Sequence, residues 1–487
     1  CVVAIMDDNV HLPQFAYASD HIPTTPPLSM YMKKRLALNL SERLSLSSPQ
    51  SRPFPLPLYL PHFATAIAIA LTAAFSFLLC TPASAADAPR ETASATNAAL
   101  PTPKEPRAVS VQMPQLEQVF ASPDFAPSAV AVSRTGRIFV EFPRFTDQPG
   151  NPSVAEVFPD GTSKPYPGGG WNDWAKGKPA DQAFVSTNTL NIFPVDPDAL
   201  WVMDTGSPFL GKNLEGAAKV IRIDLKTNTV ARVYPLPRSV LPENGYPNDL
   251  RLSPDGATAY ITESGTGAIL LLDVKSGDVR RVLSDTPLTK ADPKRVPRAE
   301  GIELRMKDGG QPFRVHADAL ELSPDGKWFY YTTVDGPLYR VATDDLKDKT
   351  LSPKEMESRV KLAADIPTVG GTAMDANGTM FFSETDTGSI TSLRVEQKPD
   401  SHVPFSRRTL VKDKRLIWPD AIFLADDGYL YVCAAQINRL PLFAGARPQE
   451  KPFFVYKVKL PPKHTLSIIE GSSSHFQKGN KADITSE

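Results

Sequence analysis

Short apolar stretches in which hydrophobic and polar positions alternate recur along the chain from about residue 111 to 462. Each unit has one apolar strand, a tight polar turn that ends in glycine, and a second strand rich in aromatic and β-branched residues. Such short alternation predicts β-strands, and the Asp-Gly, Asn-Gly and Thr-Gly pairs predict the turns, because glycine and asparagine tolerate positive φ. The copies cover residues 128–140, 189–204 (a looser one), 248–262, 318–332, 370–383 and 420–433.

The unit that begins at Asn248 continues with two further apolar stretches, at 268–274 and 278–285, which completes a four-stranded meander. One meander cannot bury both of its faces alone, so the repeats must stack on one another. Radial stacking predicts an all-β fold, a six-bladed β-propeller with four-stranded antiparallel blades over 111–462. A pair of β-sandwiches would not explain the shared turn position.

The last repeat has a third strand at 452–460 but lacks a fourth. The segment 114–122 precedes the first repeat and has no blade of its own. Pairing these two segments would close the ring and hide both sheet edges.

The front of the chain is typical of an exported protein. Three basic residues within 30–40 precede an eighteen-residue apolar run at 63–80, and Ala83-Ser84-Ala85 follows. This pattern predicts a signal peptide region over 30–85 with cleavage after Ala85, and hence a secreted protein, extracellular or periplasmic. A membrane anchor is the alternative, because eighteen apolar residues could span a bilayer. We interpret 1–29 as an upstream extension outside the mature protein, 86–110 as a disordered Ala/Pro linker, and 463–487 as a flexible tail.

Composition narrows the partners. With 53 basic and 54 acidic residues, the net charge is near zero, and no basic stripe indicates nucleic acid binding. Cleavage would leave Cys433 as the one cysteine, so no internal disulfide is expected, and its apolar surroundings indicate a small core residue. We expect a monomer without stable membrane insertion once the leader is removed.

The first strand of each propeller blade lines the central channel, and its N-terminal end opens on one mouth. Asn248, Asp318 and Asp420 share that register, so we expect them to face one another across the channel. Carboxylate and amide oxygens are ligands that Ca²⁺ prefers, so these three form a candidate metal site. Carboxylates held close also raise each other's pKa unless a cation or bound amine compensates. The alternative is that each residue caps backbone amides at the start of its strand. The same count gives Ser128 and Gly370 in two other blades, and Asn188, Thr189 or Asn191 in the looser copy.

Other candidate residues have two interpretations each. His316 lies two residues before Asp318 and could be a base at the mouth, or a solvated loop histidine. Trp171 and Trp174, in "GGGWNDW", could form an aromatic wall for an amine or aromatic ligand, or pin a long loop. Motifs such as G-x-S-x-G, H-E-x-x-H, paired C-x-x-C and a glycine-rich phosphate loop are absent from the sequence. We expect turn-capping roles for three acidic residues that end second strands, Asp204, Glu263 and Glu384.

Several stretches resemble the major royal jelly and yellow protein family, over roughly 116–460. They include "SRTGRIFVEFPRF" (133–145), "YPGGGWNDW" (166–174), "LWVMDTG" (200–206) and "RLIWPDAIFLADDGYLYVCAAQINRLPLF" (415–443). The resemblance implies a secreted six-bladed propeller, and family members are linked to dopachrome rearrangement, biogenic amine binding, and nutritional or pigmentation roles. The paired cysteines of the insect proteins are missing, which suggests a microbial branch.

The chain is similar, more distantly, to gluconolactonase and calcium-dependent phosphotriesterase propellers. Those place a glutamate of the first blade and later Asn and Asp residues around Ca²⁺. Asn248, Asp318 and Asp420 would correspond to the later ligands, but Ser128 stands at the glutamate position and Gly370 has no side chain to offer.

These observations support four functional hypotheses. The first is a secreted propeller that binds a small polar or aromatic molecule at the channel mouth through Asn248, Asp318 and Asp420, with Trp171 and Trp174 nearby. The second is a Ca²⁺-dependent hydrolase of lactones or esters. A dopachrome-type tautomerase and a protein-interaction scaffold are the others. If the protein is an enzyme, the candidate catalytic residues are Asp318, Asp420 and His316.

Overall fold

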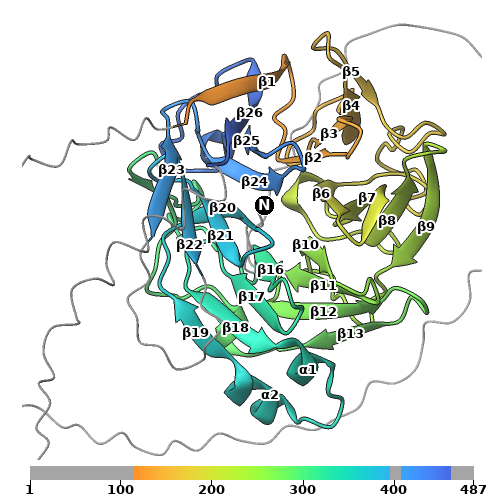
Figure 1. The fold of residues 1–487 in the computed structure, drawn as a ribbon, viewed down its shortest axis with the longest axis vertical. Helices are drawn as coiled ribbons and strands as arrows, with labels where there is room; N and C mark the ends of the chain where they lie inside the picture. Colours follow the sequence, from red (N-terminus) through yellow and green to blue (C-terminus); the bar gives the residue numbers. More distant parts are fainter. Residues whose placement is uncertain (1–113, 395–406, 462–487) are drawn as a thin grey trace, which may run out of the picture. The chain divides into compact units, whose positions relative to one another are not determined.

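The computed structural model describes residues 114–394 and 407–461. Six four-stranded antiparallel sheets surround a central axis, with β2, β6, β10, β16, β20 and β24 innermost (Figure 1). The predicted six-bladed β-propeller is therefore confirmed. The predicted extension (1–29), signal region (30–85), linker (86–110) and tail (463–487) lie outside the described residues. No helix among the described residues is long and apolar enough to cross a bilayer.

The blades follow one another along the chain, and each runs from its inner strand to the rim. Blade 1 has β2 (Ala129–Val132), β3 (Ile138–Glu141), β4 (Val154–Val157) and β5 (Ser163–Pro165); blade 2 has β6 (Thr187–Phe193), β7 (Asp196–Asp204), β8 (Lys219–Asp224) and β9 (Thr229–Pro235); blade 3 has β10 (Pro247–Leu252), β11 (Thr258–Glu263), β12 (Ala268–Asp273) and β13 (Val279–Val282); blade 4 has β16 (Leu320–Leu322), β17 (Trp328–Thr332), β18 (Leu338–Ala342) and β19 (Lys361–Ala364); blade 5 has β20 (Val369–Met374), β21 (Thr379–Glu384), β22 (Ser389–Arg394) and β23 (Arg408–Lys412); blade 6 has β24 (Pro419–Leu424), β25 (Tyr429–Ala434), β26 (Phe453–Lys459) and β1 (Leu116–Ser122).

Blade 6 closes the ring as the sequence predicts. Its rim strand β1 comes from the start of the propeller and pairs antiparallel with β26, from Leu116 opposite Val458 to Ser122 opposite Phe453. This pairing covers the edge of β26 and makes β1 the rim strand of blade 6, so the first and last segments of the propeller share one sheet.

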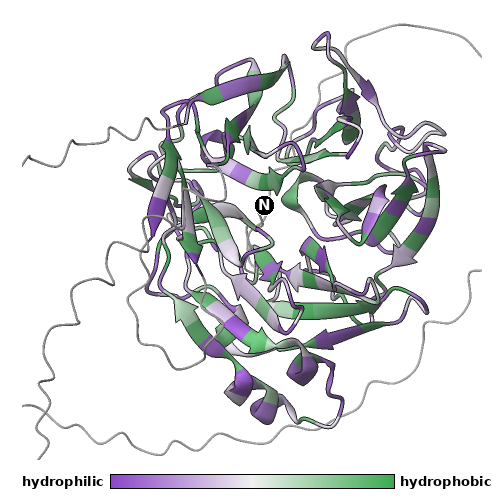
Figure 2. Ribbon diagram, in the orientation of Figure 1, coloured by the Kyte–Doolittle hydropathy of each residue, from purple (hydrophilic) through white to green (hydrophobic). Residues whose placement is uncertain are grey.

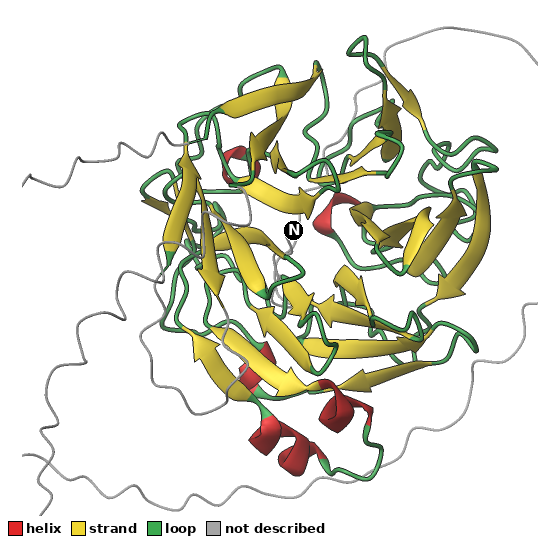
Figure 3. Ribbon diagram, in the orientation of Figure 1, coloured by secondary structure: helices red, strands yellow, loops and turns green. Residues whose placement is uncertain are grey.

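Few elements lie outside the blades. The helices α1 (Thr343–Lys347) and α2 (Pro353–Arg359) lie beside the rim of blade 4, between β18 and β19 (Figure 3). A two-stranded hairpin of β14 (Arg298–Ala299) and β15 (Ile302–Glu303) lies in the long loop before blade 4. Three short 3-10 turns complete the elements: η1 (Pro208–Leu210), η2 (Pro287–Thr289) and η3 (Ile437–Arg439).

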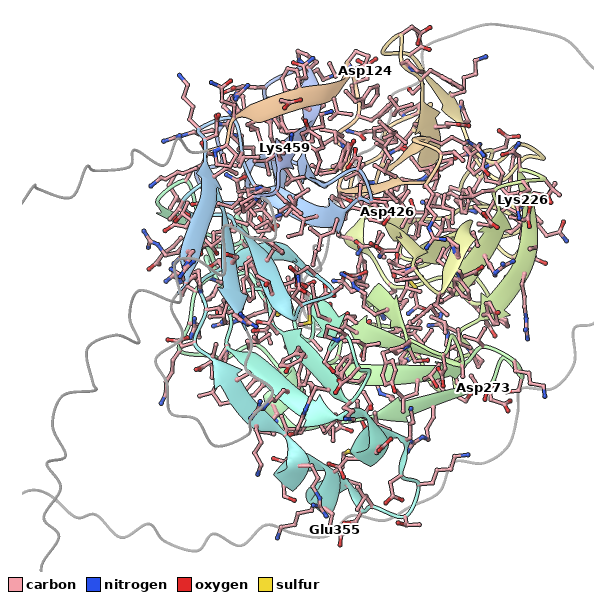
Figure 4. All side chains as sticks on the ribbon, in the orientation of Figure 1. Asp124, Lys226, Asp273, Glu355, Asp426 and Lys459 are labelled. Atoms are coloured by element: carbon pink, nitrogen blue, oxygen red, sulfur yellow. The ribbon has the colours of Figure 1, made fainter. Side chains whose placement is uncertain are left out.

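Apolar side chains fill the spaces between neighbouring blades. Between blades 2 and 3, for example, Trp201 and Met203 pack with Leu250 and Leu270, and the Trp201 ring stacks on Tyr234 with centroids 5.7 Å apart. Figure 2 shows apolar residues on most blade strands, while charged side chains such as Lys226, Asp273 and Glu355 point outward from the rim in Figure 4. Because this burial supplies most of the favourable free energy of folding, the axis can keep polar side chains that packing alone does not require.

Candidate functional site

The inner strands turn their first side chains toward the axis through local irregularities. In four blades the pairing of the first two strands shifts register at the N-terminal end of the inner strand, for example between Pro247 and Leu250 in blade 3. Such bulges re-aim a side chain and are common beside functional sites. The residues in these irregular positions include Asn188, Asn248, Gly370 and Asp420.

Asn248 and Asp318 lie in contact, as the repeat register predicts. The Asn248 Nδ2 donates a hydrogen bond to Asp318 Oδ1 over 2.6 Å, and Asn188 Nδ2 donates to Asn248 Oδ1 over 2.8 Å. Of the three candidates in the looser repeat, Asn188 therefore takes the equivalent place. Asn248, Asp318 and Asp420 are all fully buried. We call this set of buried polar residues on the axis the hub: Ser128, Glu141, Thr187, Asn188, Tyr246, Asn248, Asp318, Trp418 and Asp420.

Glu141 is a hub residue that the sequence analysis did not identify. It ends β3, is fully buried, and accepts hydrogen bonds from Ser128 Oγ over 2.5 Å and from Thr187 Oγ1 over 2.8 Å. Blade 1 therefore contributes a carboxyl group to the hub, and this group comes from its second strand. Ser128, which the repeat register placed at the mouth, is hydrogen-bonded to it. A sequence signal existed, because Glu141 shares its register with Asp204, Glu263 and Glu384.

Burial dominates the electrostatics of the hub. The pKa of Glu141 is raised to about 8, mainly by burial and also by the nearby charge of Asp420, while the hydrogen bonds from the Ser128 and Thr187 hydroxyls oppose the rise. Burial also raises the pKa of Asp318 well above its usual range, again with a contribution from Asp420, and raises the pKa of Asp420 itself. Three carboxyls that repel one another in a buried space favour a bound positive charge.

Two aromatic residues belong to the hub, both placed two residues before a predicted hub residue. Tyr246 is buried, and its hydroxyl donates to Asn188 Oδ1 over 2.9 Å. Burial raises the Tyr246 pKa well above normal, and the charges of Glu141, Asp318 and Asp420 raise it too, so all three carboxyls lie near this ring. Trp418 is fully buried, and its indole N–H favours the ionised form of Asp420, although this N–H donates no hydrogen bond of normal geometry within the described residues.

His316 occupies the same position in blade 4, and its role as a base at the mouth stays a prediction. Its Nδ1 accepts the backbone N–H of Ala291 over 3.0 Å, and burial lowers its pKa to about 4. The His316 side chain is partly exposed, so the alternative of a loop histidine also stays open.

Trp171 and Trp174 pin a loop between blades 1 and 2. The Trp171 ring lies 5.3 Å from that of Phe184, and Trp174 is buried beside Val185 with the Arg144 guanidinium 5.5 Å above its ring. A ligand-binding role for Trp171 and Trp174 stays a prediction. Tyr246 and Trp418 are aromatic residues that lie beside the hub carboxyls.

Two of the three acidic residues expected to cap turns, Asp204 and Glu263, accept backbone N–H groups of the turn that follows, whereas Glu384 is held by side chains that include the Thr387 hydroxyl of its turn. Asp204 accepts the backbone N–H groups of Val185, Ser186 and Gly206 and pairs with buried Lys219 over 2.7 Å. Glu263 accepts three backbone N–H groups and pairs with Arg281 over 2.9 Å. Glu384 pairs with Arg407 over 3.1 Å. Cys433 is fully buried in an apolar cluster, as expected.

The channel beside the hub is narrow and crossed by charges. Arg251 reaches Asp249 over 2.9 Å and Glu321 over 2.7 Å, and donates to the carbonyl of Thr372 across the channel. Burial alone would lower the Arg251 pKa, but the two carboxylates reverse this and raise it. The cavity in this part of the channel, lined by residues that include Asp249, Arg251 and Thr372, has a volume of about 10 Å³. This is room for about one water molecule.

The hub fits Ca²⁺ poorly as it is arranged. Asn248 turns its Nδ2, not its oxygen, toward Asp318, and both oxygens of Glu141 are occupied by hydroxyl groups. Within 114–394 and 407–461, no group of three or more His, Cys, Asp or Glu side chains is placed to hold a metal ion. The calcium site of the sequence analysis stays a prediction, and no step of chemistry is derived through it.

Comparison with known proteins identifies the family to which the chain belongs. The sequence model of the major royal jelly protein family matches residues 195–452. No curated protein sequence matches the chain. Similar solved structures include a luciferin-regenerating enzyme (11% identity, 71% of this chain and 95% of that one, TM-score 0.43), a putative glucose dehydrogenase of Thermus thermophilus (14%, 71% and 99%, 0.42) and the calcium-binding protein regucalcin of Agrobacterium tumefaciens (12%, 71% and 96%, 0.41). Similarity at this level leaves the chemistry of the hub to its own residues.

Proposed function

Since the chain belongs to the major royal jelly protein family, we propose that its propeller binds a small cationic molecule, such as an aromatic amine, at the hub. The observation that carries this proposal is a shortage of positive charge. Among the described residues, no lysine, arginine or histidine pairs with Glu141 or Asp318, and Asp318 Oδ2 is buried without a hydrogen-bond partner. A buried acid in that state is costly unless a ligand supplies a cation or donor.

Other buried carboxyls of the propeller have cationic partners. This contrast supports a functional reason for the hub, because the same fold elsewhere neutralises its buried acids. Among the described residues these pairs include Asp204 with Lys219, Glu263 with Arg281, and Glu321 with Arg251.

Tyr246 and Trp418 support the aromatic part of the proposal. Both rings are buried beside the acids, and aromatic faces attract organic cations as well as other rings. The calcium-dependent hydrolase, the tautomerase and the interaction scaffold lack a comparable supporting observation.

We also propose that the protein is exported. The support is the pattern of basic residues, apolar run and Ala-x-Ala at 30–85. The mature protein is expected to begin at Ala86, which N-terminal sequencing of the secreted chain tests. A cell-bound chain that keeps 63–80 would instead indicate the membrane anchor.

Thermal stabilisation by phenethylamine and tryptamine tests ligand binding, with calcium chloride and a lactone as parallel arms. We expect the amines to raise the Tm of the wild type and of Asp325→Asn, an exposed turn residue in the same blade. Asp318→Asn removes a charged partner worth about 1.5–3 kcal/mol, so binding should weaken by about tenfold or more. Equal amine affinity in Asp318→Asn and the wild type would refute the proposal. A response to calcium alone would favour the hydrolase.

A further inference from the structure

Glu141 is buried with hydroxyl groups as its hydrogen-bond partners. Ser128 Oγ lies 2.5 Å from one carboxyl oxygen and Thr187 Oγ1 lies 2.8 Å from the other. A hydroxyl can donate to a carboxylate or accept from a carboxylic acid, whereas a backbone N–H can only donate. The surroundings of Glu141 therefore satisfy both its ionised and its protonated form.

The residues that share its register are held differently. Asp204 and Glu263 receive backbone N–H groups together with a lysine or arginine, and Glu384 lies beside an arginine. Glu263 also accepts from the Thr266 hydroxyl, and Glu384 accepts from the hydroxyls of Thr387 and Thr391. Glu141 differs from all three because no lysine or arginine of the described residues pairs with it, so no fixed cation opposes its holding a proton.

Each of these two hydroxyl groups also has a second hydrogen-bond acceptor nearby. Glu141 can therefore be protonated while both hydroxyls still donate a hydrogen bond. Ser128 Oγ lies 3.5 Å from the carbonyl oxygen of Asn188, and Thr187 Oγ1 lies 3.4 Å from that of Ser153. When Glu141 is ionised, both hydroxyls donate to it. When Glu141 is protonated, its O–H donates to Ser128 Oγ, and the Ser128 hydroxyl turns to the Asn188 carbonyl.

Three titratable groups of the described residues face Glu141 from neighbouring elements: Asp420 on β24, Tyr246 before β10, and Cys433 on β25. Burial raises the pKa of Tyr246 and of Cys433 well above normal, so both stay neutral, and Asp420 is the one that can bring a charge. A negative charge on Asp420 opposes ionisation of Glu141, while an added cation favours it.

We propose that Glu141 keeps its proton while the hub is empty and releases it when a cation binds, so that the hub exchanges one proton for one positive charge. The Glu141 O–H bond breaks, the proton passes to solvent, and the net charge of the hub is unchanged. The coupling to a ligand rests on the proposed function, whereas the proton on Glu141 in the empty hub does not.

The first experiment concerns the ligand-free protein. Infrared pH-difference spectra are expected to contain a carboxylic acid C=O band that disappears with a midpoint near pH 8. The band should be missing in Glu141→Gln and kept in Glu384→Gln, its register equivalent. Thr187→Val removes a donor to the ionised form and should move the midpoint upward, which tests the assignment even if Glu141→Gln folds poorly. An unchanged band in Glu141→Gln, or an unmoved midpoint in Thr187→Val, overturns the proton-holding role.

The second experiment measures the coupling. Calorimetric titration with phenethylamine at pH 7, in buffers of different ionisation enthalpy, should show release of about one proton by the wild type and about none by Glu141→Gln. The wild-type affinity should rise up to about tenfold per pH unit below pH 8. Binding without proton release overturns the coupling. If phenethylamine does not bind while the infrared band behaves as expected, the proposed function and the coupling both fail, but the proton-holding role stands.

Discussion

Replacing Glu141 with glutamine should change how the stability of the propeller depends on pH. Glu141 is fully buried and its pKa rises from 4.5 to about 8 on folding, mainly because burial disfavours the charge. Between these values the unfolded chain loses the proton and the folded protein keeps it, so wild-type stability falls as pH rises. The span is about 3.5 pH units, and at about 1.4 kcal/mol per unit the cost reaches about 5 kcal/mol above pH 8. Glutamine does not titrate, so it makes no such pH-dependent contribution to the free energy of unfolding.

Urea unfolding at several pH values between 5 and 9 measures this effect. The free energy of unfolding of Glu141→Gln minus that of the wild type is expected to rise by about 1.4 kcal/mol per pH unit and to level off near pH 8. The slope is informative even if the amide changes the packing, because packing does not vary with pH. Ser128→Ala keeps the carboxyl but removes a donor to its ionised form, so levelling off should move to higher pH. A difference that is constant with pH would refute the reasoning.

Three further predictions concern the scaffold of the hub. Lys219→Met leaves the Asp204 carboxylate buried without its ion pair, so the free energy of unfolding in urea titrations should fall by about 3–5 kcal/mol. A double variant that also carries Asp204→Asn should recover part of this stability. Gly370→Ala places a Cβ 2.2 Å from a backbone oxygen of blade 6, so it should cost at least about 1–3 kcal/mol, whereas Gly168→Ala, with open space around it, should cost less than about 0.5 kcal/mol; equal costs would contradict the close approach. Cys433 is fully buried and its pKa is raised, so iodoacetamide should label it in unfolded but not in native protein, as followed by mass spectrometry.

The sequence predicts the ring and part of the hub because both depend on the repeat. Turn glycines and alternating apolar positions set the strands, and a count from the turn identifies Asn248 and Asp318, which lie in hydrogen-bond contact. The same count leaves blade 5 with Gly370. The structure gives the reason, because the backbone of blade 6 occupies the space that a side chain would need.

Other hub residues depend on contacts that a single repeat does not contain. Glu141 reaches Thr187, 46 positions along the chain and in the next blade. Tyr246 and Trp418 precede hub residues in the similar tripeptides Tyr-Pro-Asn and Trp-Pro-Asp, which is a signal in the sequence. The pattern alone, however, does not determine which way either ring turns.

The acidic residues that end second strands illustrate why function is harder to predict than fold. The backbone brings Glu141 and Glu263 to equivalent places, but Glu263 meets Arg281, three backbone N–H groups and the Thr266 hydroxyl. Glu141 meets two hydroxyls and no lysine or arginine of the described residues. The partners, not the position, decide whether a buried carboxyl is paired with a cation that fixes a turn or is left as an acid that can exchange its proton. Because the partners come from different strands and blades, equivalent second-strand positions of a repeat protein can differ in this respect.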